Sequence, residues 1–340
     1  MEQIIIIDFP QNPSLNAVLS FCDKLFSIPP NKKLIIDFAH MGRIEPFSMI
    51  YVAKIIREYS KFNKYIWGRN HHDKNYAAHM GFFKAFYLDH GKEPGEAFGS
   101  STYLPVTSWQ LSDIEQEARD RWQPVQQIIE AKSEELAIKL TQQEDGNLVE
   151  TITYSLREIL RNILEHSESQ TLWYCAQYWP QYHKAEIAIL DSGKGIKNAL
   201  AGNPHLKINT HSDAIQQALL PGISGKVFKG RKINRNDPWH NSGFGLYMTS
   251  RLCRNGGEFF ICSGDHGILL NENGKTHFQL EHHFKGTAVK MVLSTDKLKK
   301  LENMLSSYRE EGFKIAKQIK GVGFVSASAA SLMLSKDFKT

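Results

Sequence analysis

The first third of the chain alternates between strand-like and helix-like hydrophobic patterns. Short runs rich in isoleucine are typical of buried strands, whereas stretches with apolar residues three and four apart are typical of helices. Strands separated by helices predict βαβ units and a mainly parallel sheet. We therefore expect a small α/β domain over residues 1–105. Its predicted strands are residues 3–9, 33–38 and 65–67, and its predicted helices are residues 14–26, 47–59 and 75–88.

The pattern changes after this domain. Residues 91–99 are rich in glycine and proline, which is typical of a linker. Residues 112–140 have helical periodicity and many charges, and a polar break at residues 144–147 ends that helix. We assign residues 106–146 to a helical linker.

A second α/β pattern defines a predicted domain over residues 147–296. It includes an amphipathic helix around residues 156–166 and strand patterns at residues 184–190 and 288–293. A C-terminal region, residues 297–340, begins with a charged amphipathic helix. It ends in a tail rich in small residues, which is compatible with a helix, a partner-binding segment or disorder.

Composition narrows the class of protein. The formal net charge of +5 comes from residues spread along the chain, so it does not indicate nucleic-acid binding. No apolar run approaches the roughly 20 residues that span a bilayer, and the first residues lack the features of a secretory signal. Cys22, Cys175, Cys253 and Cys262 show no metal-ligand spacing, so we expect buried free thiols in a reducing compartment. These features predict a cytoplasmic protein without membrane attachment.

Three polar residues share one face of the helix around residues 156–166. Glu158, Asn162 and His166 are four apart and form a stripe beside the apolar one. An asparagine carbonyl can bind Mg²⁺ while phosphates and waters complete the shell, and a glutamate one turn earlier can orient or deprotonate a water. Taken alone, the helix leaves a solvated polar surface open as an alternative.

Glycine-rich turns follow that helix. Asp191 ends a predicted strand and opens a turn with Gly193, Gly195 and Ile196, and its carboxylate could accept a hydrogen bond from the amine of adenine. A second turn, Gly243-Phe244-Gly245-Leu246, opens a helix and could present backbone N–H groups to phosphate. Gly286-Thr287 begins the last strand pattern. Each turn alone is compatible with ordinary loop structure, and none matches the P-loop or the dinucleotide-binding fingerprint.

The order of these boxes, from residue 158 to residue 287, resembles the GHKL family of ATP-binding proteins, which includes gyrase, histidine kinases and MutL. The resemblance implies an α/β fold of the Bergerat type, a two-layer sandwich of a mixed sheet against helices. It implies that ATP and Mg²⁺ are the cofactors, with Asn162 as the magnesium ligand and Glu158 as the catalytic base. The nucleotide-binding residues that it implies are Asn162, His166, Asp191, Gly193, Gly195, Ile196, Lys226, Gly243, Phe244, Gly245, Leu246 and Thr287.

The resemblance also implies a lid over residues 197–242. The lid is rich in cations that could meet the γ-phosphate, and Lys226 beside Gly225 is the first choice. The others are Lys229, Arg231, Lys232 and Arg235. The N-terminal domain resembles, more weakly, a STAS-like domain, in which Ser48 lies near the phosphorylated position although its neighbours depart from the usual pattern.

Three functions stay open at this point. The first is a Mg²⁺-dependent ATPase that acts as a conformational switch on a protein partner, with a homodimer as one possibility. The second is a serine/threonine kinase of the anti-sigma-factor type, and the third is a non-catalytic nucleotide sensor. No histidine occurs between His90 and His166, so the helix ahead of the second domain lacks the acceptor of a classical histidine kinase.

Overall fold

The N-terminal part of the chain is a parallel α/β unit. The computed structural model describes residues 4–30, 32–98, 102–230, 243–298, 300–319 and 322. Its first sheet has the order β1-β2-β3, and both strand pairings are parallel, as the alternation of strands and helices predicts. The strands are β1 (Ile4–Asp8), β2 (Lys33–Asp37) and β3 (Ile66–Arg69), and the crossover helices are α1 (Leu15–Phe26) and α2 (Pro46–Ser60).

The aromatic segment at residues 75–88 forms two short helices rather than the single predicted one. They are α3 (Asn75–His79) and η1 (Lys84–Phe86). Gly81 between them has φ +82°, a left-handed conformation that interrupts a right-handed helix.

A second sheet has five strands in the order β4-β5-β6-β8-β7. All four pairings are antiparallel, so the expectation of a mixed sheet is wrong. Short connections join β5 to β6 and β7 to β8, and such hairpins can pair strands only in the antiparallel sense. The strands are β4 (Tyr103–Gln110), β5 (Thr171–Trp179), β6 (Lys184–Asp191), β7 (Glu258–Asn271) and β8 (Gly274–Ser294).

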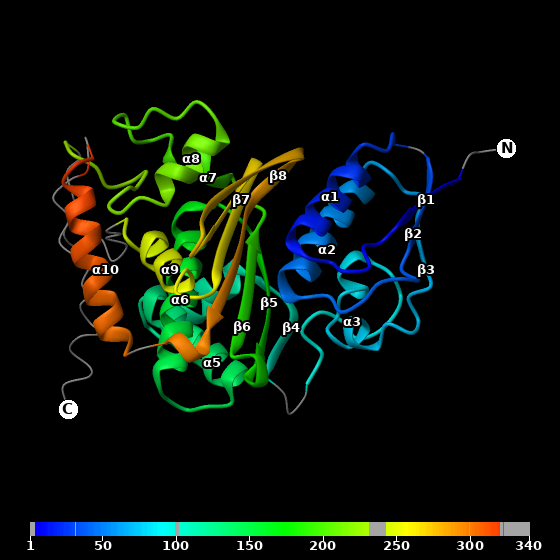
Figure 1. The fold of residues 1–340 in the computed structure, drawn as a ribbon, viewed down its shortest axis with the longest axis horizontal. Coiled ribbons are helices and arrows are strands. Elements are labelled where there is room, and N and C mark those ends of the chain that lie inside the picture. The colour runs from blue at the N-terminus through cyan, green and yellow to red at the C-terminus, as the bar shows by residue number, and fades with distance from the viewer. Residues whose placement is uncertain are drawn as a thin grey trace.

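Helices cover one face of this sheet (Figure 1). The segment predicted as one helix at residues 112–140 is two, because Trp122 has a left-handed φ of 52° and Pro124 follows it. Both of these helices belong to the same hydrophobic cluster as α6. The helices of this part are α4 (Leu111–Asp120), α5 (Val125–Thr141), α6 (Asn147–His166), α7 (Gly195–Leu200), α8 (His211–Ala218), α9 (Gly245–Cys253) and α10 (Leu301–Ala316), with η2 (Pro180–Tyr182) and η3 (Thr295–Lys297).

The other face of the five-stranded sheet is buried under α1 and α2, which lie between the two sheets (Figure 1). Tyr51 stacks on Phe284 with ring centroids 5.2 Å apart, and Phe47 meets Phe260 edge-on at 5.3 Å. The four cysteines are buried thiols, as expected, and none forms a disulfide. Ser48, which the STAS resemblance places near a phosphorylated serine, is only 3% exposed and donates a hydrogen bond to the Pro13 carbonyl oxygen at 2.8 Å.

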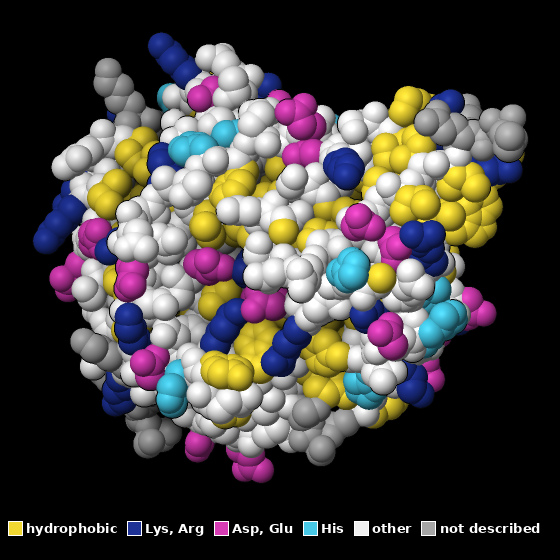
Figure 2. All heavy atoms as spheres, turned by 45° about the vertical axis from the view of Figure 1, so that its right-hand side comes forward, with side chains coloured by type: hydrophobic (Ala, Val, Ile, Leu, Met, Phe, Trp, Pro, Cys, Tyr) yellow, Lys and Arg dark blue, Asp and Glu magenta, His cyan; other side chains and the backbone are white. Residues whose placement is uncertain are grey.

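The three-stranded sheet keeps one side toward solvent. Ile4, Ile6, Tyr65 and Trp67 are each about half exposed. Figure 2 shows hydrophobic side chains gathered on the side of the molecule that carries this sheet. Among the described residues, no helix combines the length and apolar character needed to cross a bilayer.

Polar contacts also join the two parts of the chain. The Phe47 N–H group, in the first turn of α2, donates to Glu186 Oε1 at 3.0 Å. Farther along α2, the Tyr51 hydroxyl lies 3.0 Å from His282 Nε2, and His282 Nδ1 lies 2.6 Å from Asp23 Oδ1 on α1. A carboxylate at Nδ1 favours the tautomer in which Nε2 accepts a hydrogen bond from Tyr51.

We predict that Tyr51→Phe lowers the free energy of unfolding by about 1–3 kcal/mol, because it leaves Nε2 of His282 buried without a donor. His282 is only 3% exposed. Urea denaturation measures the change. Tyr65→Phe, at a half-exposed tyrosine, is the control and should change the unfolding free energy by less than about 0.5 kcal/mol. Equal effects of the two variants would contradict the importance of this contact.

Candidate functional site

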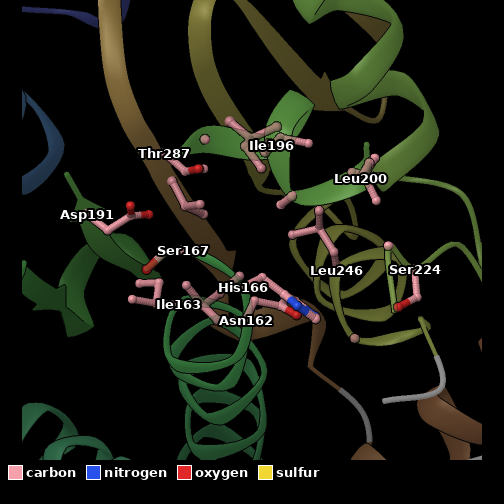
Figure 3. Close-up of a pocket in the computed structure, with 18 of the residues that line it drawn as sticks. Asn162, Ile163, His166, Ser167, Asp191, Ile196, Leu200, Ser224, Leu246 and Thr287 are labelled. Carbon is pink, nitrogen blue, oxygen red and sulfur yellow. The ribbon is translucent and has the colours of Figure 1, made fainter. Parts of the chain in front are cut away.

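A pocket lies between the C-terminal half of α6, strands β6, β7 and β8, and the segments at residues 195–200 and 221–225 (Figure 3). It encloses about 880 Å³ of space when its open mouth is counted. Its walls are mainly apolar, with a few polar groups. The apolar lining residues are Ile159, Ile163, Ile189, Ile196, Ala199, Leu200, Ala218, Ile223, Leu246, Ile261 and Val289.

Helix α6 brings two of the predicted polar residues to this pocket. Asn162 and His166 line it and project from α6 toward the cavity (Figure 3). Ile159 and Ile163 line it from the same helix, because the apolar stripe and the polar stripe meet at its edge. The part of the polar stripe formed by Asn162 and His166 is therefore a wall of the pocket rather than a solvated surface.

Glu158 lies behind the wall. Glu158 is not one of the described residues that line the pocket, and it is only 7% exposed. Its Oε1 accepts a hydrogen bond from Arg157 Nη2 at 3.0 Å, and Arg157 also pairs with Glu130 at 3.1 Å. A Cβ atom on Gly245 would lie 2.1 Å from Glu158 Oε2, so a larger residue at this position would have to displace the carboxylate.

Asp191 reaches the pocket from the end of β6 and is 2% exposed. Its Oδ1 accepts a hydrogen bond from the Gly193 N–H at 2.7 Å. Burial raises the pKa of Asp191 to about 6, while the backbone of Gly193, the charge of Lys54 and the backbone of Thr287 oppose the rise. Thr287, on the neighbouring strand β8, lies beside Asp191 in Figure 3. The two residues form one polar end of the pocket.

The first glycine turn closes tightly against the end of α6. A Cβ atom on Gly193 would lie 2.0 Å from the Ser167 carbonyl oxygen, which accepts the Lys194 N–H at 2.7 Å. Gly195 has φ +73°, and the next N–H, of Ile196, donates to Ser263 Oγ at 3.1 Å. Of this turn, Asp191, Gly195 and Ile196 line the pocket, whereas Gly193 acts through backbone geometry.

The second glycine turn borders the opposite side. Gly243 has φ +69°, and its carbonyl oxygen accepts the Gly222 N–H at 3.0 Å. Gly243, Gly245 and Leu246 line the pocket. The Phe244 ring packs on Phe313 of α10, with centroids 5.1 Å apart, and within the described part of the chain it is not a lining residue.

The predicted lid is only partly described. Arg231, Lys232 and Arg235 lie outside the described residues. Lys226 is exposed at the end of α6, where its Nζ donates to the Glu165 carbonyl oxygen at 2.5 Å. Burial lowers the pKa of His166 to about 4, and the nearby charge of Lys226 contributes to this shift.

Some pocket residues carried little signal in the sequence. Ile189, Ile261 and Val289 are ordinary strand residues, and only the alternation of sides along a strand could have assigned them to this face. Ile223 and Ser224 lie in the predicted lid, in the stretch that ends at Gly225 and Lys226. Ala199 and Leu200 on α7 had no distinguishing pattern.

Comparison with known proteins adds no further assignment. No protein-family model matches the chain, and a search of curated proteins finds no similar sequence. The described residues include no group of three or more His, Cys, Asp or Glu side chains arranged to hold a metal ion.

We predict that His166 is neutral at pH 7 and gains its proton only near pH 4. The unfolded chain would bind that proton near pH 6.5, so protonation favours unfolding. The contribution of His166 to stability should be complete above pH 6.5 and should decrease as the pH falls toward 4. Titration of its ring protons by NMR tests the prediction, with His166→Gln to assign the signal. A midpoint near 6.5 would contradict it.

Proposed function

We propose that the pocket binds ATP and that the protein is a nucleotide-dependent conformational switch. The observation that supports this most is the placement of Asn162 and Asp191 in one apolar pocket, together with glycine turns on two sides. Apolar walls suit a purine base, and a carboxylate accepts a hydrogen bond from the exocyclic amine of adenine. In this proposal Asp191 and Thr287 hold the base, and Gly243 and Gly245 face the phosphates.

The donor set fits Mg²⁺ bound together with phosphate. Asn162 offers a single amide oxygen, and the described residues hold no acidic cluster that would bind a metal alone. Magnesium commonly takes one or two protein ligands and completes its shell with phosphate oxygens and water. When bound, Mg²⁺ would neutralise part of the phosphate charge. Asn162 would orient it through the side-chain carbonyl.

The contacts of Phe244 support the switch. Phe244 lies between Gly243 and Gly245, two pocket residues, and its ring packs on α10. A change in this turn on nucleotide binding would move the surface that α10 presents. We propose that a protein partner reads that surface, which is the order of events in many nucleotide switches.

The environment of Glu158 favours slow hydrolysis or none. Its carboxylate is held by Arg157 and lies behind Gly245, so it must leave Arg157 to reach a water in the pocket. This observation supports the non-catalytic nucleotide sensor as the second candidate. We propose weak Mg²⁺-dependent ATPase activity with Glu158 as its base. Transfer of the γ-phosphate to a hydroxyl group of a partner protein would instead indicate a kinase.

We predict that Glu158→Gln binds ATP as the wild type does but releases phosphate about 100-fold more slowly or not at all, because it removes a general base. Calorimetry measures binding, and γ-labelled ATP with Mg²⁺ measures released phosphate and label on protein together. Glu130→Gln, which changes the other partner of Arg157, is the control. Equal turnover by Glu158→Gln and wild type would remove Glu158 from the mechanism.

We further predict that Asp191→Asn weakens ATP binding at pH 7.5 by about tenfold or more, because it replaces a charged acceptor by an amide that also presents donors. Glu168→Gln is the matched control, since Glu168 is 74% exposed and pairs with Lys194 in the same turn. Calorimetry of both variants tests the role of Asp191. Unchanged affinity in Asp191→Asn would show that this carboxylate does not read the base.

A further inference from the structure

A lysine from the N-terminal domain reaches the turn that forms the polar end of the pocket. Lys54 lies on α2, and its side chain is only 7% exposed. Its Nζ donates to Ser192 Oγ at 2.8 Å and to Glu58 Oε1 at 2.7 Å, and it lies 5.1 Å from the centre of the Phe284 ring. A buried ammonium is costly unless it is paired, so these partners hold it in one place.

The residue that Lys54 contacts is the one next to Asp191. Ser192 is held from two sides, because its hydroxyl accepts from Lys54 and its N–H donates to Ser169 Oγ at 3.1 Å. Asp191 in turn accepts from the N–H of Gly193. Lys54 therefore anchors the turn that positions the Asp191 carboxylate, and its charge also stabilises the ionised form of that carboxylate.

We propose that Lys54 is a positioning residue of the nucleotide site, so that adenine recognition depends on α2 of the N-terminal domain being docked on the five-stranded sheet. This inference rests on the proposed function. The site is then shared between the two parts of the chain, since Asp191 contacts the base and Lys54 sets the position and charge of Asp191. A partner that displaces the N-terminal domain would weaken nucleotide binding through this contact.

Other charges around the turn differ in their placement. Glu58 on α2 and Lys61, the residue after α2, act on Lys54 from its own segment. The remaining groups are the Cys262 thiol on β7, which feels the charge of Lys54, the exposed pair Lys194 and Glu168, and His166 at the end of α6. Among these groups, Lys54 is the cation that lowers the pKa of Asp191.

The test compares ATP with purine riboside triphosphate, which lacks the exocyclic amine. The ratio of their dissociation constants isolates the amine contact, and titration of the phosphates cancels between them. In the wild type the preference for ATP should be lost as the pH falls below about 6, where Asp191 gains its proton. In Lys54→Met the same loss should occur at a pH higher by about one unit or more.

Matched variants separate this role from stability. Lys290→Met removes a second ammonium that is also 7% exposed and lies at the same interface, where it pairs with Glu258 at 2.6 Å. It should lower the melting temperature as Lys54→Met does, but leave the pH dependence of the ATP preference unchanged. Lys54→Arg should keep the wild-type pH profile. Ser192→Ala should lower the preference for ATP at each pH where the wild type shows one, without moving the midpoint of its loss.

The outcomes are distinct. A shifted pH profile in Lys54→Met, with a wild-type profile in Lys290→Met, supports the proposal. Wild-type behaviour of both Lys54→Met and Ser192→Ala overturns it while leaving ATP binding intact. A wild-type protein that binds neither triphosphate overturns the proposed function and this inference with it. If Lys54→Met does not fold, Ser192→Ala still decides, because it keeps the charge and removes the contact.

Discussion

The structure depends on burial of both faces of the five-stranded sheet. An antiparallel sheet can leave one face in water, but here α1 and α2 cover the face opposite α6. The rings of Phe47 and Tyr51 pack directly on Phe260 and Phe284, so the N-terminal unit completes the core of the second part. Each part alone would leave apolar surface exposed, because α1 and α2 pack against both sheets.

Strand β6 shows how this packing shapes the site. Ala188 and Leu190 face the N-terminal helices, whereas Ile187 and Ile189 face α6. By the same alternation Asp191 lies on the α6 side and enters the pocket. The next residue, Ser192, faces α2 and accepts the hydrogen bond from Lys54. The end of β6 and the residue after it therefore carry the pocket and the contact with the N-terminal unit at adjacent positions.

The sequence predicted some of the pocket residues but not the contacts that hold them in place. The resemblance carried by the α6 stripe and by the order of the glycine turns predicted that Asn162, Asp191 and Gly245 share one site, and all three line the pocket. The hydrogen bond between Arg157 and Glu158 was not predictable, because adjacent residues on a helix do not face each other. The contact of Glu158 with Gly245 joins residues that are far apart in the sequence. Lys54 was missed because its partner is 138 residues away.

Gly245 and Phe244 make two contacts that the proposed switch uses. It begins α9, its backbone lies against the Glu158 carboxylate, and Phe244 before it packs on α10. In the proposed switch, a movement of this turn on nucleotide binding would change the contact of Gly245 with Glu158 and the contact of Phe244 with α10 together, because the two residues are adjacent in the chain. In that proposal, a change at the Glu158 carboxylate and a change at α10 would be coupled through the covalent chain, without a longer path through the protein.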